Sequence, residues 1–209
     1  MTRIEQLIAT YPDLEHCAPE VEAALQILTT CYRNGGKVLT CGNGGSAADA
    51  EHIVGELMKG YLLKRPLPEE MRARLISVGA EDGDYLASHL QGALPAISLV
   101  NQTSLLSAIA NDTAADMVYA QQVYAYGQKG DTLIGISTSG NSRNVILAMQ
   151  VARALGVQTI ALTGPTGGKL KPLCDVCICV PAESTPAIQE RHLPIFHVLC
   201  AMLEEEFFA

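Results

Sequence analysis

The sequence predicts an α/β fold, a three-layer sandwich in which a parallel five-stranded sheet is flanked by helices. Short apolar runs alternate with segments of helical periodicity, which is the order expected of strands joined by helical crossovers. The runs are apolar throughout, as in strands buried on both faces. The 209 residues, 48% of them hydrophobic, are enough for a full core, so we expect a single domain over residues 1–209. The expected strands are residues 38–41, 96–100, 132–136, 159–163 and 176–180.

Residues 1–34 are expected to form N-terminal helices. A short amphipathic helix is broken at Tyr11-Pro12, and a second helix over residues 19–33 ends before Gly35-Gly36. The second helix carries an apolar stripe. Such a stripe can pack on the chain's own sheet or against another subunit, and the sequence favours neither.

The strand at residues 38–41 leads into a glycine-rich turn, residues 42–46, and then into a helix. Glycines let the backbone turn tightly and approach a ligand closely, and Ser46 is the expected N-cap of the helix. The N-terminus of that helix suits an anion or a sugar oxygen. His52 and Glu56 follow four residues apart, so they share one helix face. We therefore expect a ligand-binding turn and an ionisable pair on one helix.

The same turn also matches a dinucleotide-binding fingerprint at Gly42, Gly44 and Ala47. That fingerprint requires an acidic residue at the end of a second strand about 20 residues later. The chain there reads Lys64-Arg65-Pro66 with no strand, so the sequence favours a phosphate or sugar site. A purely structural turn, followed by a surface ion pair on the helix, is the other alternative.

Helices are also expected on either side of Asn111-Asp112. The first begins with Thr103 or Ser104 as its N-cap and ends near Ala110, and the second covers residues 116–126. The asparagine and the aspartate then lie in the connection between the two helices.

A second candidate turn follows the strand at residues 132–136. Residues 137–142 read Ser-Thr-Ser-Gly-Asn-Ser and lead into a helix over residues 142–155. Hydroxyls and backbone amides at a helix N-terminus can hold a phosphate without a lysine. The turn is not a Walker motif, because Gly-Lys-Ser/Thr is absent. A serine-rich N-cap without any ligand is the alternative.

The chain closes with a long helix over about residues 186–207, which carries three further candidates. Gln189 and His197 are eight residues apart, or about 12 Å of helix rise. Within one chain they are too far apart to coordinate the same small atom. Either the ligand spans the distance between them, or neighbouring subunits supply the two residues. His192 is expected at the surface, without a role.

Charge and cysteine content exclude several classes of protein. The net charge is −8 with no basic run, which argues against nucleic-acid and acidic-membrane binding. The N-terminus is charged and amphipathic, unlike a signal peptide. The seven cysteines are an odd count without framework spacing, so we expect a reducing, cytoplasmic location. Cys174 and Cys177 would point to opposite faces of a strand, so we interpret them as buried packing residues rather than as a metal site.

Five motifs in this order resemble the phosphoheptose isomerase family of the SIS (sugar isomerase) domain. They are residues 41–46, His52-x-x-x-Glu56, Asn111-Asp112, residues 137–142, and Ile188-Gln189-Glu190 with His197. The resemblance extends over nearly the whole chain. It implies conversion of sedoheptulose 7-phosphate to D-glycero-D-manno-heptose 7-phosphate through an enediol, which supplies heptose for surface polysaccharide.

The resemblance also implies residue roles. Glu56 and His197 would be the acid–base residues, and one Zn²⁺ per subunit would be bound by His52, Glu56, Gln189 and His197. The enediol route does not strictly require this metal. A homotetramer with active sites at subunit interfaces is the implied assembly. The implied substrate-binding residues are Asn43, Gly44, Gly45, Ser46, Glu56, Asn111, Asp112, Ser137, Thr138, Ser139, Ser142 and Gln189.

Two departures from the family pattern bear on the substrate. Residues 69–94 look like one or two helices where the family has a shorter connection, so we expect a helical insertion. A surface helix pair is the favoured interpretation, and a lid or an interface flap is the alternative. Pro186 and Ala187 stand where the family usually has a polar residue and an arginine.

Two rival functions remain open at this point. A non-catalytic SIS homotetramer that binds the replication initiator DnaA has the same fold, but it lacks the carboxylate at the Glu56 position and its turn reads Gly-Asn-Gly-Thr-Ser. The other rival is an isomerase or sensor for a different phosphosugar. Glu56 and Gly45 favour the heptose enzyme over the first rival.

Overall fold

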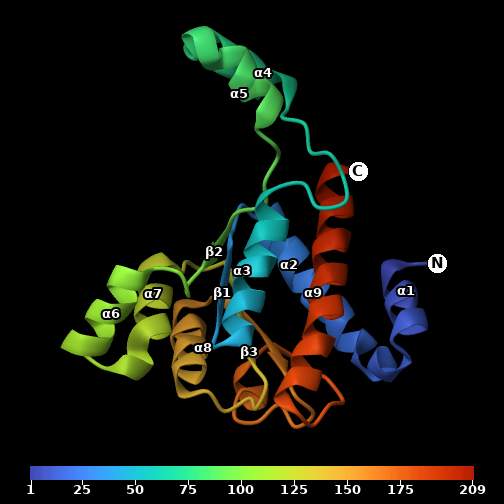
Figure 1. Ribbon diagram of the computed structural model, residues 1–209, viewed down its shortest axis with the longest axis vertical. Coiled ribbons are helices and arrows are strands. Elements are labelled where there is room, and N and C mark those ends of the chain that lie inside the picture. Colours follow the sequence, from blue (N-terminus) through green and yellow to red (C-terminus); the bar gives the residue numbers. More distant parts are fainter.

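The computed structural model describes all 209 residues and confirms the expected α/β sandwich (Figure 1). All strand pairs are parallel, and the strand order is β2-β1-β3-β4-β5. The strands are β1 Val38–Gly42, β2 Ala96–Ser98, β3 Thr132–Ser137, β4 Gln158–Thr163 and β5 Val176–Cys179. The α-helices are α1 Arg3–Thr10, α2 Ala18–Arg33, α3 Gly45–Met58, α4 Glu69–Val78, α5 Gly83–His89, α6 Thr103–Asp112, α7 Val118–Tyr126, α8 Arg143–Leu155 and α9 Thr185–Phe208. Short 3₁₀ turns are η1 Pro12–Cys17, η2 Ala80–Asp82, η3 Ala115–Met117 and η4 Lys171–Leu173.

Alternate residues of the strands face two separate cores. On one face, Ile134 and Ile160 pack against α1, α2, α3 and α9, and on the other Leu133 packs against α7 and α8. The α2 stripe, including Leu28, is buried within the single chain, so the sheet covers it without another subunit. This arrangement fixes α3 and α9 side by side on one face of the sheet (Figure 1).

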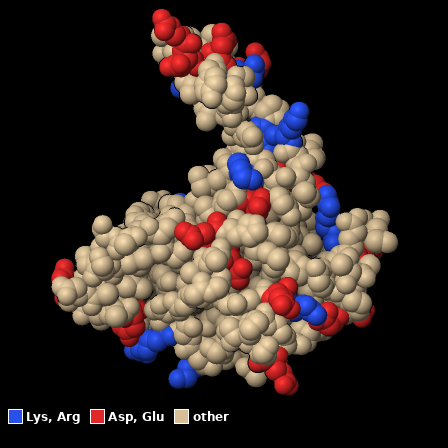
Figure 2. All heavy atoms as spheres, in the orientation of Figure 1, with Lys and Arg blue, Asp and Glu red and all other residues tan.

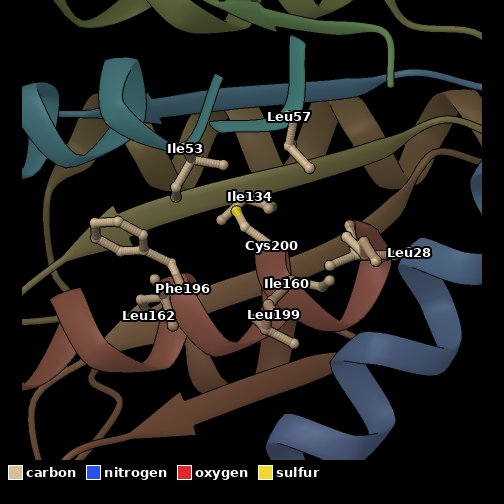
Figure 3. Close-up of a pocket in the computed structure, with 10 residues that line it drawn as sticks. Leu28, Ile53, Leu57, Ile134, Ile160, Leu162, Phe196, Leu199 and Cys200 are labelled. Carbon is tan, nitrogen blue, oxygen red and sulfur yellow. The ribbon is translucent and has the colours of Figure 1, made fainter. Parts of the chain in front are cut away.

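The core between α2, α3 and α9 is closely packed (Figure 3). Ten apolar side chains line a gap of only about 10 Å³ there. Such a space is at the lower limit for one water molecule and has no polar partner to offer it. This part of the molecule is therefore packed core, and a sugar phosphate must bind elsewhere.

The strand order places two of the predicted turns next to each other. From β1 the chain first adds β2 on one side of β1, and it then crosses over to add β3 on the other side. The boundary between β1 and β3 is therefore the point at which the strand order reverses. In sheets of this order, ligands bind outside the carboxyl ends of the strands at that boundary. Gly42 of β1 is in register with Ile136 of β3, so residues 42–46 and residues 137–142 leave the sheet side by side.

Two expected helix starts and one expected helix end differ in the structure. The N-cap of α3 is Gly44 with φ of +57°, so the turn closes earlier than expected and Ser46 is buried inside the first helical turn. Gln102 precedes α6, and neither Thr103 nor Ser104 caps it. The helix also continues through Asp112 because nothing in the sequence breaks it there, so Asn111 and Asp112 are its last residues.

The predicted helices within residues 69–94 are confirmed as α4 and α5, which stand away from the sheet (Figure 1). None of the helices in the chain combines the length and the apolar character needed to span a bilayer. All seven cysteines are free thiols. Cys174 and Cys177 are half-buried rather than buried, because β5 is an edge strand.

The expectation of an exposed His192 is wrong, because α9 lies lengthwise on the sheet and turns this residue inward. The side chain is fully buried, and Nε2 lies 3.2 Å from the carbonyl oxygen of Thr163 at the end of β4. The carbonyl can only accept, so Nε2 carries the proton and donates it. Burial lowers the pKa of His192 to about 4, although the carbonyl contact opposes the shift. The neutral ring thus joins α9 to the end of β4 by a hydrogen bond.

We expect His192 to make stability depend on pH. A histidine whose pKa falls from about 6.5 when unfolded to about 4 when folded destabilises the native state progressively as the pH drops below 6.5. Between pH 7 and pH 4 the loss from this residue is about 3 kcal/mol. Urea unfolding of the wild type and of His192→Gln at both pH values isolates the effect. The difference in unfolding free energy between the two proteins should shrink by that amount, and a constant difference would contradict the assignment.

Candidate active site

The turn between β3 and α8 carries several serine hydroxyls that hydrogen-bond within the turn. Ser137 Oγ and Ser142 Oγ are 2.9 Å apart, and the backbone amide of Asn141 donates to Ser139 Oγ at 3.1 Å. Gly140 has φ of +65°, and a Cβ there would lie 2.1 Å from the carbonyl oxygen of Gly167, so only glycine fits. The Ser142 side chain does not cap α8. The backbone amide of Val145 donates to Asn144 Oδ1, whereas the amides of Arg143 and Asn144 remain available to an anion.

The glycine-rich turn after β1 is tied to this serine-rich turn. The side-chain amides of Asn43 and Asn144 hydrogen-bond each other at 2.9 Å, which joins the turn to the first turn of α8. The Tyr119 hydroxyl donates to the Gly42 carbonyl and lies 3.3 Å from Asn43 Oδ1. The two turns thus form one edge of a site.

Helix α9 contributes to the site at two places along its length. Near its start, the Gln189 side chain packs on Gly45 so closely that a Cβ at Gly45 would lie 2.5 Å from Gln189 Nε2. Two turns later, His197 faces α3. Gln189 forms no hydrogen bond to His197 or to its partners, so these two residues occupy different parts of the site, in agreement with their spacing.

Three of the predicted residues converge within the single chain. His52 Nε2 lies 3.1 Å from Glu56 Oε1 and 3.4 Å from His197 Nε2. Phe196 presents its ring at a steep angle to both histidines, with centroids 5.3 and 5.0 Å away, and Tyr61 lies 5.6 Å from His197. Neither ring was foreseen from the sequence. The aromatic contacts help to orient the two imidazoles.

The electrostatics of this cluster favour a neutral imidazole beside a carboxylate. Burial and the neighbouring His52 lower the pKa of His197, while Glu56 acts in the opposite direction. Glu56 is 14% exposed, and its Oε2 is buried without a hydrogen-bond partner. One turn before His52, burial raises the pKa of Asp49 to about 6, and His52 opposes the shift. The cluster therefore contains groups that exchange protons near neutral pH.

A buried ion pair holds the two helices of the cluster together. Arg65 and Glu204 are both 0% exposed at their side chains, with Nε 2.7 Å from Oε1. The other guanidinium nitrogens donate to the carbonyl oxygens of Leu57 and Glu56 at 2.7 and 3.0 Å. Arg65 therefore binds the backbone of Glu56 directly, while its partner lies on α9, seven residues after His197.

The carboxylate of Glu204 is satisfied by more than the arginine. The backbone amides of Tyr61, Leu62 and Leu63 donate to it at 2.7, 2.7 and 2.9 Å. Burial alone would raise the pKa of Glu204, but these amides and Arg65 hold it below its usual value. The buried contact of Glu204 was not predicted from the sequence. Its one signal there is an acidic residue within the apolar face of α9.

Asn111 and Asp112 lie apart from the other predicted site residues. They are exposed at the end of α6, where Asn111 Nδ2 donates to Asp112 Oδ1 at 2.7 Å. No hydrogen bond connects either residue to the two turns or to the histidine cluster.

The His52 cluster has the donors of a zinc site, although no set of three or more His, Cys, Asp or Glu side chains forms a complete metal site. Two histidines and one glutamate are a known catalytic zinc set. Ligands about 2.0–2.2 Å from a tetrahedral ion lie about 3.3–3.6 Å apart, and the 3.1 and 3.4 Å separations at His52 are near that range. The unpaired Oε2 of Glu56 also favours a missing ligand. The residues present therefore fit Zn²⁺, and Gln189 lies outside the set.

The fold and the motifs agree with known proteins. The family model described as "SIS domain" matches residues 4–88 and 86–164, two segments that meet within α5. A phosphoheptose isomerase of Rhodospirillum rubrum is 41% identical over 192 residues, covering 92% of this chain and 88% of the relative. One from Helicobacter pylori strain P12 is 42% identical over 194 residues, covering 93% and 88%.

Solved structures give the same result. A phosphoheptose isomerase from Neisseria gonorrhoeae superimposes with a TM-score of 0.73 at 35% identity, covering 95% of this chain and 94% of that one. A phosphoheptose isomerase from Francisella tularensis has a TM-score of 0.74 at 29% identity, covering 98% and 100%.

We expect Glu204→Gln to destabilise the protein strongly. The substitution leaves the Arg65 charge buried without a counter-ion and weakens the acceptor of three backbone amides, which costs about 3–5 kcal/mol. The matched control is Glu205→Gln on the same helix, whose partner Arg3 is partly exposed, so the control should lose less than about 1 kcal/mol. Urea unfolding measures both. A Glu204→Gln variant as stable as the control would mean that the pair does not hold the helices together.

Proposed function

This chain belongs to the phosphoheptose isomerases of the SIS-domain family, and we propose how its own residues carry out the reaction of that family. The chain is a sugar-phosphate isomerase that interconverts sedoheptulose 7-phosphate and D-glycero-D-manno-heptose 7-phosphate. The observation that carries the residue assignment is the convergence of His52, Glu56 and His197 from two helices. The glycine-rich turn at the start of α3, the helix that carries His52 and Glu56, lies beside the serine-rich turn after β3.

The phosphate end of the sugar is assigned to the paired turns. Ser137, Ser139 and Ser142 offer hydroxyls, Thr138 adds another, and the uncapped start of α8 offers amides. Ser46 and Gly44 lie on the neighbouring turn, with Asn43 positioned for a sugar hydroxyl. His52 is six residues beyond Ser46, about 9 Å of helix rise. A long sugar with its phosphate at the far end suits such a span, and the remote anchor orients the reacting carbons.

Glu56 is assigned as the base of the aldose–ketose interconversion. The reaction removes a proton from the carbon beside the carbonyl and returns it to the neighbouring carbon through an enediol. Glu56 Oε1 is engaged by His52, whereas Oε2 has no hydrogen-bond partner and lies 3.9 Å from Lys59 Nζ. We assign the proton transfer to the Glu56 carboxylate, with His52 holding its orientation.

His197 is assigned to the carbonyl oxygen of the substrate. Its lowered pKa keeps the ring neutral at pH 7, and a neutral imidazole can still donate a hydrogen bond to a developing enediolate. Phe196 packs edge-on against this ring, and His197 and Tyr61 line an open hollow of about 270 Å³.

Zinc is proposed as a cofactor held by His52, Glu56 and His197. When bound, Zn²⁺ would polarise the sugar carbonyl as a Lewis acid. Gln189, which packs on Gly45, is assigned to the substrate rather than to the metal in this chain.

We also infer a homotetramer whose sites are completed by neighbouring subunits, in the cytoplasm. The separation of Asn111 and Asp112 from the other candidates supports this inference, because a site shared between chains leaves its parts apart in one chain. The seven free thiols are compatible with a reducing compartment. The DnaA-binding alternative is not favoured, because the relatives reported above are phosphoheptose isomerases.

We expect Glu56→Gln to abolish most of the turnover while preserving the fold. A missing general base reduces the rate by about 10²–10⁴-fold. The assay follows sedoheptulose 7-phosphate in deuterated water, where enediol chemistry adds one deuterium to the product, by chromatography and mass spectrometry. Glu51→Gln, an exposed glutamate on the same helix, is the matched control and should retain wild-type turnover. If Glu56→Gln kept its rate, or if the wild type converted only other phosphosugars, the assignment would fail.

Metal content provides a separate check on the proposed cofactor. Protein dialysed against zinc should retain about one ion per chain, and His52→Ala should retain less than a tenth of that amount. His89→Ala, at an exposed histidine far from the cluster, should bind like the wild type. Elemental analysis measures all three proteins without reference to activity. Equal metal content in the wild type and in His52→Ala would contradict the assignment of zinc to this site.

A further inference from the structure

The contact between the two turns of the site involves a residue to which no role has been assigned so far, Asn144. It is the second residue of α8, and its side chain pairs with that of Asn43 across the boundary between β1 and β3. We propose that Asn144 is a positioning residue, which fixes the Asn43 amide as a hydrogen-bond donor to the substrate. This inference rests on the proposed function, because Asn43 is assigned there to a sugar hydroxyl.

The two side-chain amides form a closed pair. Asn43 Nδ2 donates to Asn144 Oδ1 at 2.9 Å, and Asn144 Nδ2 donates to Asn43 Oδ1 at 2.9 Å. Each amide therefore fixes the orientation of the other, because turning one of them by half a rotation would bring donor against donor and acceptor against acceptor. The pair is open to a ligand, since Asn43 is exposed and Asn144 is half-buried.

The backbone selects one of the two orientations that a closed pair allows. The amide of Val145 donates to Asn144 Oδ1 at 3.0 Å. A backbone N–H can only donate, so the atom of Asn144 that faces it must be the oxygen. The Val145 amide lies in the first turn of α8, where amides have no partner within the helix. The start of the helix thereby orients Asn144, and Asn144 orients Asn43.

The oxygens of the pair are engaged within the protein, whereas each nitrogen keeps a free N–H. Asn144 Oδ1 accepts from both Asn43 and Val145, which uses its two lone pairs. Asn43 Oδ1 accepts from Asn144 and also lies 3.3 Å from the Tyr119 hydroxyl. Asn43 can therefore offer an N–H to a ligand without breaking the pair. A substrate oxygen beside it is recognised as an acceptor.

Charged side chains do not replace this directional contact. On the face that Figure 2 shows, lysine and arginine side chains are scattered and form no broad basic patch. Arg143, the residue before Asn144, is paired with Asp116 at 3.1 Å. Lys169 is exposed and contacts the serine-rich turn through its backbone amide. Binding of the sugar phosphate thus depends on N–H and O–H donors held in fixed directions, and the orientation of one amide affects it.

A double-mutant cycle on substrate affinity tests the positioning role. All variants are made in the Glu56→Gln background, in which sedoheptulose 7-phosphate should bind without turnover, and calorimetric titration measures the affinity. We expect Asn43→Leu and Asn144→Leu each to weaken binding about tenfold, the size of one lost hydrogen bond. The variant with both changes should bind at most about twofold more weakly than Asn43→Leu, because Asn144 acts through Asn43.

Inorganic phosphate separates this role from support of the serine-rich turn. Its affinity should be the same in every variant, because a free phosphate does not reach the sugar-binding amide. Gln150→Leu removes an exposed amide from the same helix and should leave both affinities unchanged. Urea unfolding shows whether each variant is folded, and Asn144→Ala takes the place of Asn144→Leu if the latter is not.

Three results would overturn the positioning role while leaving wild-type turnover intact. Losses that add in the variant with both changes would mean that Asn144 contacts the sugar itself. An equal loss of affinity for inorganic phosphate would mean that Asn144 supports the phosphate site. Unchanged affinity in Asn144→Leu would mean that Asn43 is oriented without it. A wild type that neither binds nor converts sedoheptulose 7-phosphate would instead overturn the proposed function, and this inference with it.

Discussion

The buried ion pair between Arg65 and Glu204 is the constraint on which the active-site geometry depends. Burying two charges costs several kcal/mol per ion unless each is fully hydrogen-bonded. Here the carboxylate accepts three backbone amides, and the guanidinium donates to two carbonyls at the end of α3. Because one of those carbonyls belongs to Glu56, the pair fixes the position of this backbone relative to the helix that carries His197. Two residues that are distant in the sequence are thereby held within reach of one substrate.

The sheet topology supplies the other half of the site. The strand order reverses between β1 and β3, so the turns that follow these strands leave the same edge next to each other. One turn begins the helix that carries His52 and Glu56, and the other holds the serine hydroxyls. The anchoring of an anion is thus assigned to the two turns at this edge of the sheet, and the movement of protons to residues farther along α3. This separation lets binding energy at the phosphate position the reacting carbons.

Much of the fold followed from periodicity and turn chemistry, because these are local properties. All five strands were located from apolar runs, and the helix expected after the serine-rich turn is present as α8. The spacing of His52 and Glu56 correctly placed them on one helix face. The conformation of Gly44, the burial of His192 and the contact between Arg65 and Glu204 could not be predicted, since each depends on tertiary packing.

A crystal structure of the protein with a reduced, unreactive analogue of sedoheptulose 7-phosphate tests the central claim most directly. The account predicts the phosphate at the hydroxyls of Ser137, Ser139 and Ser142. It also predicts the reacting carbons about 3–3.5 Å from the Glu56 carboxylate, with His197 facing the oxygen beside them. A phosphate bound elsewhere, or a sugar whose first two carbons lie away from both Glu56 and His197 in every subunit, would contradict it.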